Sequence, residues 1–263
     1  MLLKDKVIIV SGIGPGLGVK LAVESAREGA RGVAISARTA EKLDDAEKRI
    51  KEANAACKVL KVVTDIRDAG QCKRLAEAAN KEFGRIDGLA NSAFQWGAQG
   101  TADGSDLNAW REIMETNVIG TMNMTQAVVP IMKAQGGGAI VNISSMASVK
   151  PHTGEAGYAA TKGAINVASK YLAIELGASN IRVNVARMGW MLGVPVQGFV
   201  SYDAKQKGVP EKSYYDAIAA NIALRRLVTD TECARAALFL LSDYASGVTG
   251  AVLDANGGEY LTM

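Results

Sequence analysis

Lys6–Glu28 reads KVIIVSGIGPGLGVKLAVESARE, an apolar run followed by a glycine-rich loop and an amphipathic stretch. The apolar run is typical of a buried parallel strand, and the stretch from about Val19 is typical of a helix. The loop Ser11–Gly18 follows the pattern GxxxGxG through glycines 12, 16 and 18, because Leu17 stands where GxGxxG requires a glycine. Glycines allow a tight turn, and the N–H groups at a helix N-terminus attract phosphate. This unit predicts a pyrophosphate-binding loop between the first strand and the first helix.

Strand-like and helix-like segments alternate along the rest of the chain. Apolar runs at residues 32–37, 58–64, 86–90, 139–143, 181–186 and 251–254 are separated by segments with helical patterning. This rhythm is typical of a parallel sheet covered by helices on both faces. The sequence therefore predicts one doubly wound, Rossmann-like α/β domain over residues 1–263, with a seven-stranded parallel sheet. We expect one continuous helix over residues 107–134, an irregular stretch over residues 189–210 and a helix near residues 214–223.

Composition and charge argue against several functional classes. A net charge of +3 without a run of Lys or Arg gives no indication of nucleic-acid binding. We see no signal peptide and no stretch of ~20 apolar residues, so neither export nor a membrane span is expected. Three scattered cysteines, at positions 57, 72 and 233, are typical of reduced thiols in a cytoplasmic protein. The single histidine, His152, excludes a multi-histidine metal site, and we expect no metal.

The stretch Asn142–Gly163, NISSMASVKPHTGEAGYAATKG, holds the candidate catalytic residues. Tyr158 and Lys162 are four residues apart on a predicted helix, so they share one face about 5–6 Å apart. A tyrosine has a reference pKa of ~10, and an ammonium at ~4 Å supplies roughly the 4 kcal/mol that would bring it near neutrality. Ser145 lies just past the end of the preceding apolar run, thirteen residues before Tyr158.

This spacing predicts that Lys162 lowers the pKa of Tyr158 and that Ser145 donates a hydrogen bond to a substrate oxygen. The alternative interpretation is an ordinary amphipathic helix with a surface lysine and a core tyrosine.

The end of the second predicted strand indicates which nucleotide the loop accepts. NAD-binding chains usually carry a carboxylate there for the ribose hydroxyls. This chain has Arg38 and no acid in Ser36–Thr39, and a guanidinium suits a 2′-phosphate. We therefore favour NADP(H) as the cofactor, with NAD(H) as the alternative if Arg38 is only a solvated surface residue. Asp65, after the third strand, is either an acceptor for the adenine amino group or a helix cap.

Motifs spread along the whole chain resemble those of the short-chain dehydrogenase/reductase family. They are, in order, SGIGPGLG, TDIRD, DGLANSA, TNVIG, NISS, YAATK, IRVN and VTGAVLDANGG. The resemblance implies hydride transfer between a nicotinamide and a carbinol carbon, with Tyr158 as general acid or base and Lys162 also binding the nicotinamide ribose. It implies that Asn117 holds a water linked to Lys162, so the expected catalytic residues are Asn117, Ser145, Tyr158 and Lys162. It further implies a homodimer or homotetramer, with the helices of Leu107 and Tyr158 packing across an interface.

The resemblance also completes the expected cofactor site. Three positions depart from the family pattern: Phe94 replaces a glycine, Met188 replaces a proline, and Gly193 replaces a threonine that contacts the carboxamide. These departures leave open how the nicotinamide is hydrogen-bonded. The expected cofactor-binding residues are Ser11, Gly12, Gly14, Gly16, Leu17, Gly18, Arg38, Asp65, Ile66, Asn91, Ser92, Ala93, Tyr158, Lys162, Met188 and Gly189.

Aromatic residues concentrate in two segments that follow predicted strands. Ligands in such sheets bind beyond the carboxyl ends of the strands, so we expect an apolar pocket under a lid within residues 189–225. Half of the chain's aromatic residues lie in these segments: Phe94, Trp96, Trp190, Phe199, Tyr202, Tyr214 and Tyr215. The expected substrate-binding residues are Ser145, Phe94, Trp96, His152, Tyr158, Trp190 and Phe199, with a plain surface position as the alternative for His152.

Together these patterns predict an oxidoreductase: an NADP(H)-linked carbonyl reductase or alcohol dehydrogenase acting on an apolar or cyclic secondary alcohol or ketone. The first alternative is an NAD-linked dehydrogenase of cyclic alcohols or dihydrodiols. A remote alternative is a non-catalytic nucleotide-sensing protein on the same fold. Such a protein would tolerate loss of Tyr158 or Lys162, and this chain keeps both.

Overall fold

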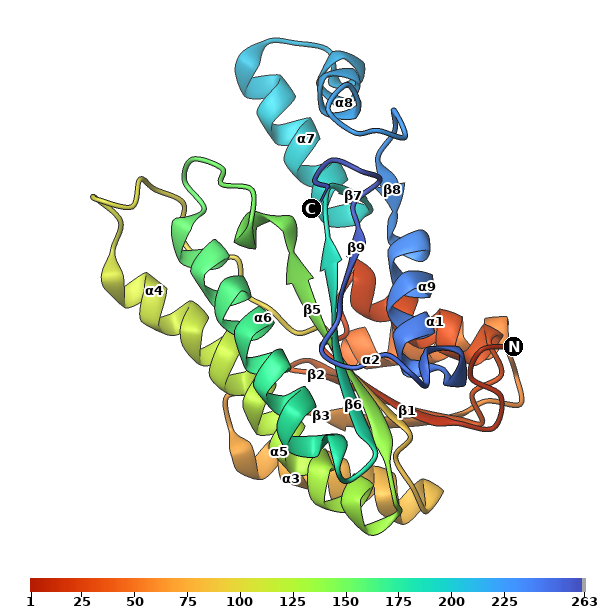
Figure 1. Ribbon diagram of the computed structural model, residues 1–263. Coiled ribbons are helices and arrows are strands. Elements are labelled where there is room, and N and C mark those ends of the chain that lie inside the picture. The colour runs from red at the N-terminus through yellow and green to blue at the C-terminus, as the bar shows by residue number, and fades with distance from the viewer. Residues whose placement is uncertain (262–263) are drawn as a thin grey trace.

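A computed structural model of the chain describes residues 1–261 and contains the predicted seven-stranded sheet (Figure 1). The strand order is β3-β2-β1-β4-β5-β6-β9, and every neighbouring pair is parallel. The predicted fold class is therefore confirmed. The strands of this sheet are β1 (Val7–Ser11), β2 (Gly32–Ala37), β3 (Lys58–Val63), β4 (Gly88–Asn91), β5 (Gly138–Ser145), β6 (Ile181–Met188) and β9 (Val252–Ala255).

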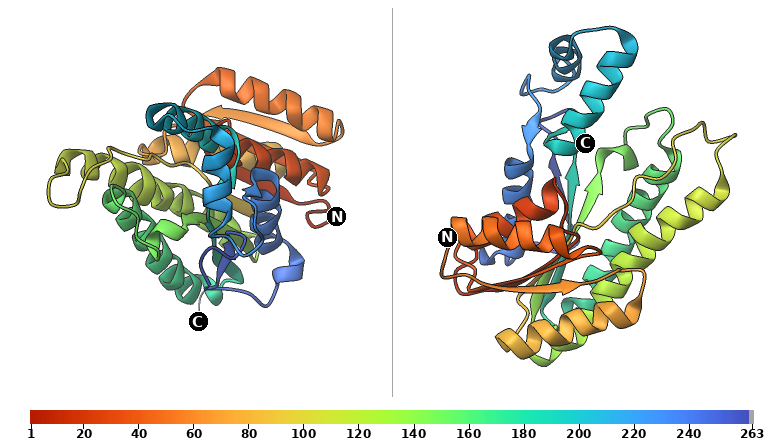
Figure 2. Two further views of the ribbon diagram at one scale, coloured as in Figure 1. Left: turned by 90° about the horizontal axis from the view of Figure 1, so that it is seen from above. Right: turned by 180° about the vertical axis from the view of Figure 1, so that it is seen from behind.

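Helices cover both faces of the sheet, as the end-on view in Figure 2 shows. Alternate residues of β1 explain why, because Ile8 and Val10 enter one core and Val7 and Ile9 enter the other. The first core is closed by α1 (Leu17–Arg27), α2 (Ala40–Ala53) and α9 (Asp230–Leu241). The second is closed by α3 (Ala69–Phe83), α5 (Gly120–Ala134) and α6 (Ala156–Gly177).

The helix predicted over residues 107–134 is interrupted. It consists of α4 (Leu107–Met114), a π-helical turn, η1 (Glu115–Ile119), and α5. Asp106 caps α4, because its side chain accepts a hydrogen bond from the Asn108 N–H. A π turn accommodates one extra residue per turn, which apolar periodicity does not reveal, and such turns are frequent at functional sites. Asn117 lies at the centre of this turn.

The prediction of an irregular stretch over residues 189–210 is wrong. This segment forms β7 (Met191–Leu192) and α7 (Val194–Lys207), followed by α8 (Glu211–Ala219) and β8 (Val228–Thr229). Pro195 lies in the first turn of α7, where a proline needs no N–H partner, and Gly208 ends the helix at a φ of 65°. This proline and this glycine therefore mark the two ends of a helix.

The pair α7 and α8 projects beyond the carboxyl ends of the strands, at the top of Figure 1. Two short 3₁₀ turns, η2 (Met146–Ser148) and η3 (Asp243–Ala245), follow β5 and α9. Within residues 1–261, none of the helices combines the length and apolar character that a membrane span needs.

Candidate active site

One large cavity, of about 540 Å³, opens at the carboxyl ends of the central strands. The strand order reverses between β1 and β4, and such a switch point is where open α/β sheets bind ligands. The cavity runs from the glycine loop past Arg38 and Asp65, then along Ser145 and Tyr158 to the base of α7 at Trp190. Its volume suits a small organic ligand.

The glycine loop forms one wall, and its glycines are required by close contacts. A Cβ on Gly12, whose φ is +99°, would lie 2.2 Å from the backbone nitrogen of Ala93. A Cβ on Gly18 would lie 2.1 Å from the Gly12 carbonyl oxygen. The α1 N-terminus begins after Gly16 without a side-chain cap. The residues therefore fit a pyrophosphate, because the close-set backbone leaves N–H groups and the positive end of a helix beside the cavity.

Charged residues gather at the far end of this wall. Arg38 lines the cavity together with Lys42, a cation that sequence reasoning missed although it lies only four residues further along the chain. Asp65 is bound by Arg67, whose Nε lies 3.0 Å from Oδ1 and whose Nη2 lies 2.5 Å from Oδ2. This hydrogen bonding holds the pKa of the Asp65 carboxyl below its usual value. Asp65 thus already has a cationic partner from its own loop.

Ser145, Tyr158 and Lys162 come together at the other end of the cavity. Ser145 is the last residue of β5, and its hydroxyl oxygen accepts a hydrogen bond from the Ala147 N–H at 3.2 Å. Tyr158 and Lys162 occupy the first two turns of α6, and both are buried. The Lys162 ammonium donates to the Ile143 carbonyl oxygen at 2.9 Å. Three of the four side chains predicted as catalytic therefore share one pocket wall.

Phe94 and Trp96, which we call the aromatic cover, lie over this group. The indole of Trp96 stacks on the Tyr158 ring, with centroids 4.5 Å apart and planes 19° from parallel. The Phe94 ring lies 6.2 Å from the Tyr158 ring, and the Lys162 nitrogen lies 5.6 Å from the Phe94 centroid. Both covering side chains are themselves partly exposed, at 50% and 42%. The cover therefore separates a buried hydroxyl and a buried ammonium from solvent.

The predicted lowering of the Tyr158 pKa is not found in this state of the protein. Burial raises the pKa of Tyr158 above its usual range, a hydrogen bond with Ser145 offsets part of this, and the charge of Glu155 adds to the rise. Burial also lowers the pKa of Lys162 to about 8. Under the cover, loss of hydration outweighs the attraction between phenolate and ammonium on which the sequence argument relied.

The Asn117 side chain binds the backbone between the two residues of the aromatic cover. Its side-chain oxygen accepts from the Gln95 N–H at 2.7 Å, and its side-chain nitrogen donates to the Gln95 carbonyl at 2.9 Å and to the Thr161 hydroxyl at 3.0 Å. The Gln95 side chain is bound in turn by the Thr116 hydroxyl at 2.9 Å. In this structure Asn117 thus fixes the residue between Phe94 and Trp96, while the water expected from the family resemblance stays a prediction.

Most of the predicted catalytic, cofactor and substrate residues line the cavity, and four do not. Ser11, Asn91 and Asn117 are buried behind its wall, and Phe199 packs against Trp190 with ring centroids 5.9 Å apart. Those that line it are Gly12, Gly14, Gly16, Leu17, Gly18, Arg38, Asp65, Ile66, Ser92, Ala93, Phe94, Trp96, Ser145, His152, Tyr158, Lys162, Met188, Gly189 and Trp190.

The segment after β6 explains one departure from the family pattern. A Cβ on Gly193 would lie 3.0 Å from the Asp230 carboxylate, so a larger side chain fits there only if this contact moves. Pro195 contacts the glycine loop, because its Cγ lies 3.2 Å from where a Gly16 Cβ would be. Sequence reasoning missed Pro195 because this segment was expected to be irregular.

Comparisons with known proteins identify the family of this chain. A family model described as enoyl-(acyl carrier protein) reductase matches residues 12–259. A structure of a short-chain type dehydrogenase/reductase from Mycobacterium ulcerans superposes with a TM-score of 0.90 and 31% identity, covering 98% of this chain and 91% of the other. The chain belongs to the short-chain dehydrogenase/reductase family.

Other members of the short-chain dehydrogenase/reductase family act on different substrates. A 3alpha-hydroxysteroid dehydrogenase of Mediterraneibacter gnavus is 33% identical over 262 residues, 98% of each chain. L-sorbose reductase from Gluconobacter frateurii, solved in complex with NADPH and L-sorbose, is 30% identical with a TM-score of 0.93 and covers 100% of this chain and 99% of the other. The chain is thus similar to oxidoreductases whose named substrates range from a steroid to a sugar.

Proposed function

We propose that this protein is an NAD(P)(H)-dependent oxidoreductase that interconverts a secondary alcohol and a ketone, with NADP(H) preferred and with an apolar or cyclic substrate. The observation that carries the proposal is the convergence of Ser145, Tyr158 and Lys162 on a cavity whose opposite wall is the glycine loop. A relative solved with NADPH supports the choice of cofactor class. When bound, the nicotinamide would accept or supply the hydride.

The side chains divide the remaining chemistry according to their hydrogen-bonding capacity. The Ser145 oxygen accepts from the Ala147 N–H, and its own proton, which is shared with Tyr158 in this structure, would turn to the substrate oxygen. Lys162 uses one N–H on Ile143 and has two left for ribose hydroxyls. Tyr158 is then the acid that protonates the ketone oxygen during reduction and the base during oxidation. Opening of the aromatic cover would rehydrate this group, lowering the pKa of Tyr158 and raising that of Lys162.

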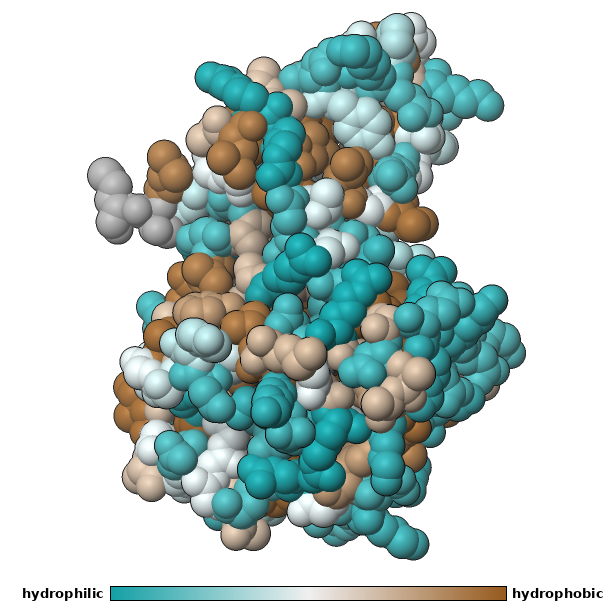
Figure 3. Space-filling model, turned by 90° about the vertical axis from the view of Figure 1, so that its right-hand side faces the viewer, coloured by the Kyte–Doolittle hydropathy of each residue, from teal (hydrophilic) through white to brown (hydrophobic). Residues whose placement is uncertain are grey.

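The pair α7 and α8 is proposed as a lid over the substrate end. Trp190 lines the cavity, Phe199 packs on Trp190, and Tyr214 packs edge-on to Phe199 at 6.2 Å. On the side seen in Figure 3, hydrophobic residues (brown) gather beneath the hydrophilic tip of this upper lobe. A lid with an apolar underside favours an apolar or cyclic substrate over a small polyol.

Reversing the charge at position 38 tests the proposed preference for NADP(H). We expect Arg38→Glu to weaken NADPH binding by about 10- to 100-fold, because a hydrogen-bonded guanidinium at the 2′-phosphate is replaced by a repelling carboxylate. NADH binding should change little. Titration of the purified protein with each nucleotide, followed by nicotinamide fluorescence, measures both effects. Lys48→Glu, an exposed change on α2 away from the cavity lining, is the matched control.

The outcomes of this titration separate the candidate functions. A wild-type preference for NADH would favour the NAD-linked dehydrogenase of cyclic alcohols or dihydrodiols. Failure to bind either nucleotide would overturn the proposed function.

We also infer that the protein forms a homodimer or homotetramer. Val167, Tyr171 and Ile174 lie on one face of α6 and are 57%, 64% and 81% exposed, a stripe that a partner copy would cover. Ile174→Asp is expected to shift the wild-type oligomer towards monomer in sedimentation velocity runs, whereas Val63→Asp on the edge strand β3 should not. A monomeric wild-type protein would contradict the inference.

A further inference from the structure

The substrate end of the cavity contains one carboxylate that the proposed chemistry does not use. Glu155 is half-buried, lines the cavity and immediately precedes α6, one helical turn before Tyr158. Its charge raises the pKa of Tyr158, and both side chains line the same cavity. Glu155 therefore lies in the same cavity that a ligand of Tyr158 would occupy.

Other glutamates that are shielded from solvent form ion pairs, and the Glu155 carboxylate does not. Glu24 is bound by Arg27 and Arg235, and Glu259 is bound by Lys150. Within residues 1–261 the Glu155 side chain has no hydrogen bond or ion pair, although burial is sufficient to raise its pKa. Withdrawing a carboxylate from water without a partner is unfavourable, so this position is poorly explained by stability alone.

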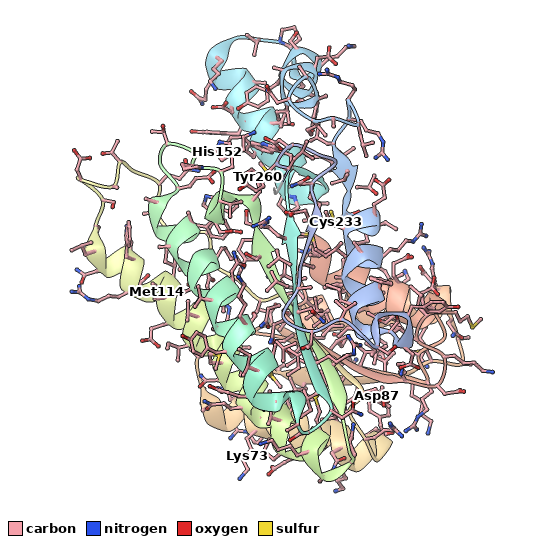
Figure 4. All side chains as sticks on the ribbon, viewed as in Figure 1. Lys73, Asp87, Met114, His152, Cys233 and Tyr260 are labelled. Carbon is pink, nitrogen blue, oxygen red and sulfur yellow. The ribbon has the colours of Figure 1, made fainter. Side chains whose placement is uncertain are left out.

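His152 presents a second unsatisfied group to the same space. It lines the cavity, on the loop before α6 and near the base of α7 in Figure 4, and its Nε2 atom is buried without a hydrogen-bond partner in the described chain. Its backbone carbonyl accepts a hydrogen bond from the Glu155 N–H at 3.4 Å, so the two residues belong to the same turn. A carboxylate only accepts hydrogen bonds, whereas an imidazole nitrogen donates or accepts according to its tautomer.

These two groups together select the chemistry of a ligand. With the His152 proton on Nε2, a hydroxyl group donates to Glu155 and accepts from Nε2, so it satisfies both. An ammonium group has no lone pair for that Nε2–H, and a carboxylate or phosphate would be repelled by Glu155. A plain hydrocarbon would leave both polar groups buried and unpaired.

We propose that Glu155 and His152 form a hydroxyl-recognition subsite, so that the preferred substrate is an apolar or cyclic ketone bearing a hydroxyl group close to the reacting carbonyl. In the oxidation direction the substrate is the corresponding diol. This inference rests on the proposed function and narrows its substrate class. The aromatic cover and the lid would contact the hydrocarbon part of the substrate, and the subsite would form hydrogen bonds with its hydroxyl group.

A matched pair of ketones tests the subsite. We would measure kcat/KM of the wild-type enzyme with 2-hydroxycyclohexanone and with cyclohexanone, at saturating NADPH, and then repeat both in Glu155→Leu and Glu155→Gln. The expected wild-type preference for the hydroxyketone is about 10- to 100-fold, the range for a hydrogen bond that a site is built to make. Glu155→Leu should abolish the preference, and Glu155→Gln, which keeps a neutral acceptor, should retain part of it.

The ratio of the two kcat/KM values is the decisive quantity. Removing the charge of Glu155 also lowers the pKa of Tyr158, and this changes the rates of both ketones by a common factor that the ratio cancels. His152→Phe should reduce the ratio as well, and Glu82→Leu, an exposed change on α3, should leave it unchanged. A wild-type ratio near one, or a ratio unaffected by Glu155→Leu, overturns the subsite while the proposed function stands. No turnover of either ketone overturns the proposed function and the subsite with it.

Discussion

Replacing Tyr158 with phenylalanine is expected to lower kcat/KM for ketone reduction by about 10²- to 10⁴-fold, the contribution of a positioned general acid. The phenyl ring retains the stacking surface for Trp96, whose centroid lies 4.5 Å away, and it leaves the neighbouring Lys162 in place. Only the hydroxyl group, and with it the hydrogen bond with Ser145, is lost. Steady-state assays with NADPH and a cyclic ketone measure the effect.

Cofactor binding separates a chemical role of Tyr158 from a structural one. The Tyr158→Phe variant should bind NADPH almost as tightly as the wild type, because the ring and its packing are unchanged. Phe83→Tyr, a change of the same size in a buried ring of α3, serves as the control for an aromatic substitution away from the cavity. Activity within a factor of three of the wild type in Tyr158→Phe would rule out the proposed acid.

The second large effect is on stability. Arg187 in β6 and Asp254 in β9 form a buried pair with two parallel hydrogen bonds of 2.6 Å each, and the Arg187 side chain is only 5% exposed. Arg187→Leu leaves the Asp254 carboxylate withdrawn from water without its partner, and removing one member of a buried pair typically costs about 3–5 kcal/mol. We expect the free energy of unfolding, measured by urea denaturation, to fall by that amount.

Two further variants separate this pair from ordinary surface charges. Arg187→Leu combined with Asp254→Leu removes the orphaned charge, so the double variant should recover part of the lost stability. Lys212→Leu breaks an exposed pair with Asp216 on α8, and it should change the free energy of unfolding by less than ~1 kcal/mol. If Arg187→Leu and Lys212→Leu lowered the free energy of unfolding equally, the buried pair would have no special role in stability.

The parts of the site that could be predicted from sequence are those set by local spacing. Gly12 and Gly18 were predicted because a strand–loop–helix unit needs them, and the structure adds the contacts that exclude a Cβ. Tyr158 and Lys162 were predicted because residues four apart on a helix share a face. Ser145 was predicted from its place at a strand end. Each of these inferences spans fewer than twenty residues.

The parts that could not be predicted depend on residues that are distant along the chain. The sequence gives no signal that the Trp96 ring lies on Tyr158, so the dominance of burial in the Tyr158 pKa was missed. Helix α7 was missed because Pro195 and Gly208 suggest a loop until the helix limits are known. Glu155 became significant only once the start of α6 and the partners of each glutamate were known.

The two hydrogen bonds between the Asn117 side chain and the Gln95 backbone affect how fast the site becomes accessible. Both backbone polar groups of Gln95 are tied to one side chain, which itself sits in a π-helical turn, so this point of the loop acts as a fixed pivot. Phe94 and Trp96 on either side can then uncover Tyr158 and Lys162 by rotating about their own side-chain bonds, without displacing the backbone between them. Rotations of partly exposed side chains occur in picoseconds to nanoseconds. Access to Tyr158 and Lys162 therefore requires only side-chain rotations, which are far faster than any rearrangement of the α7–α8 pair.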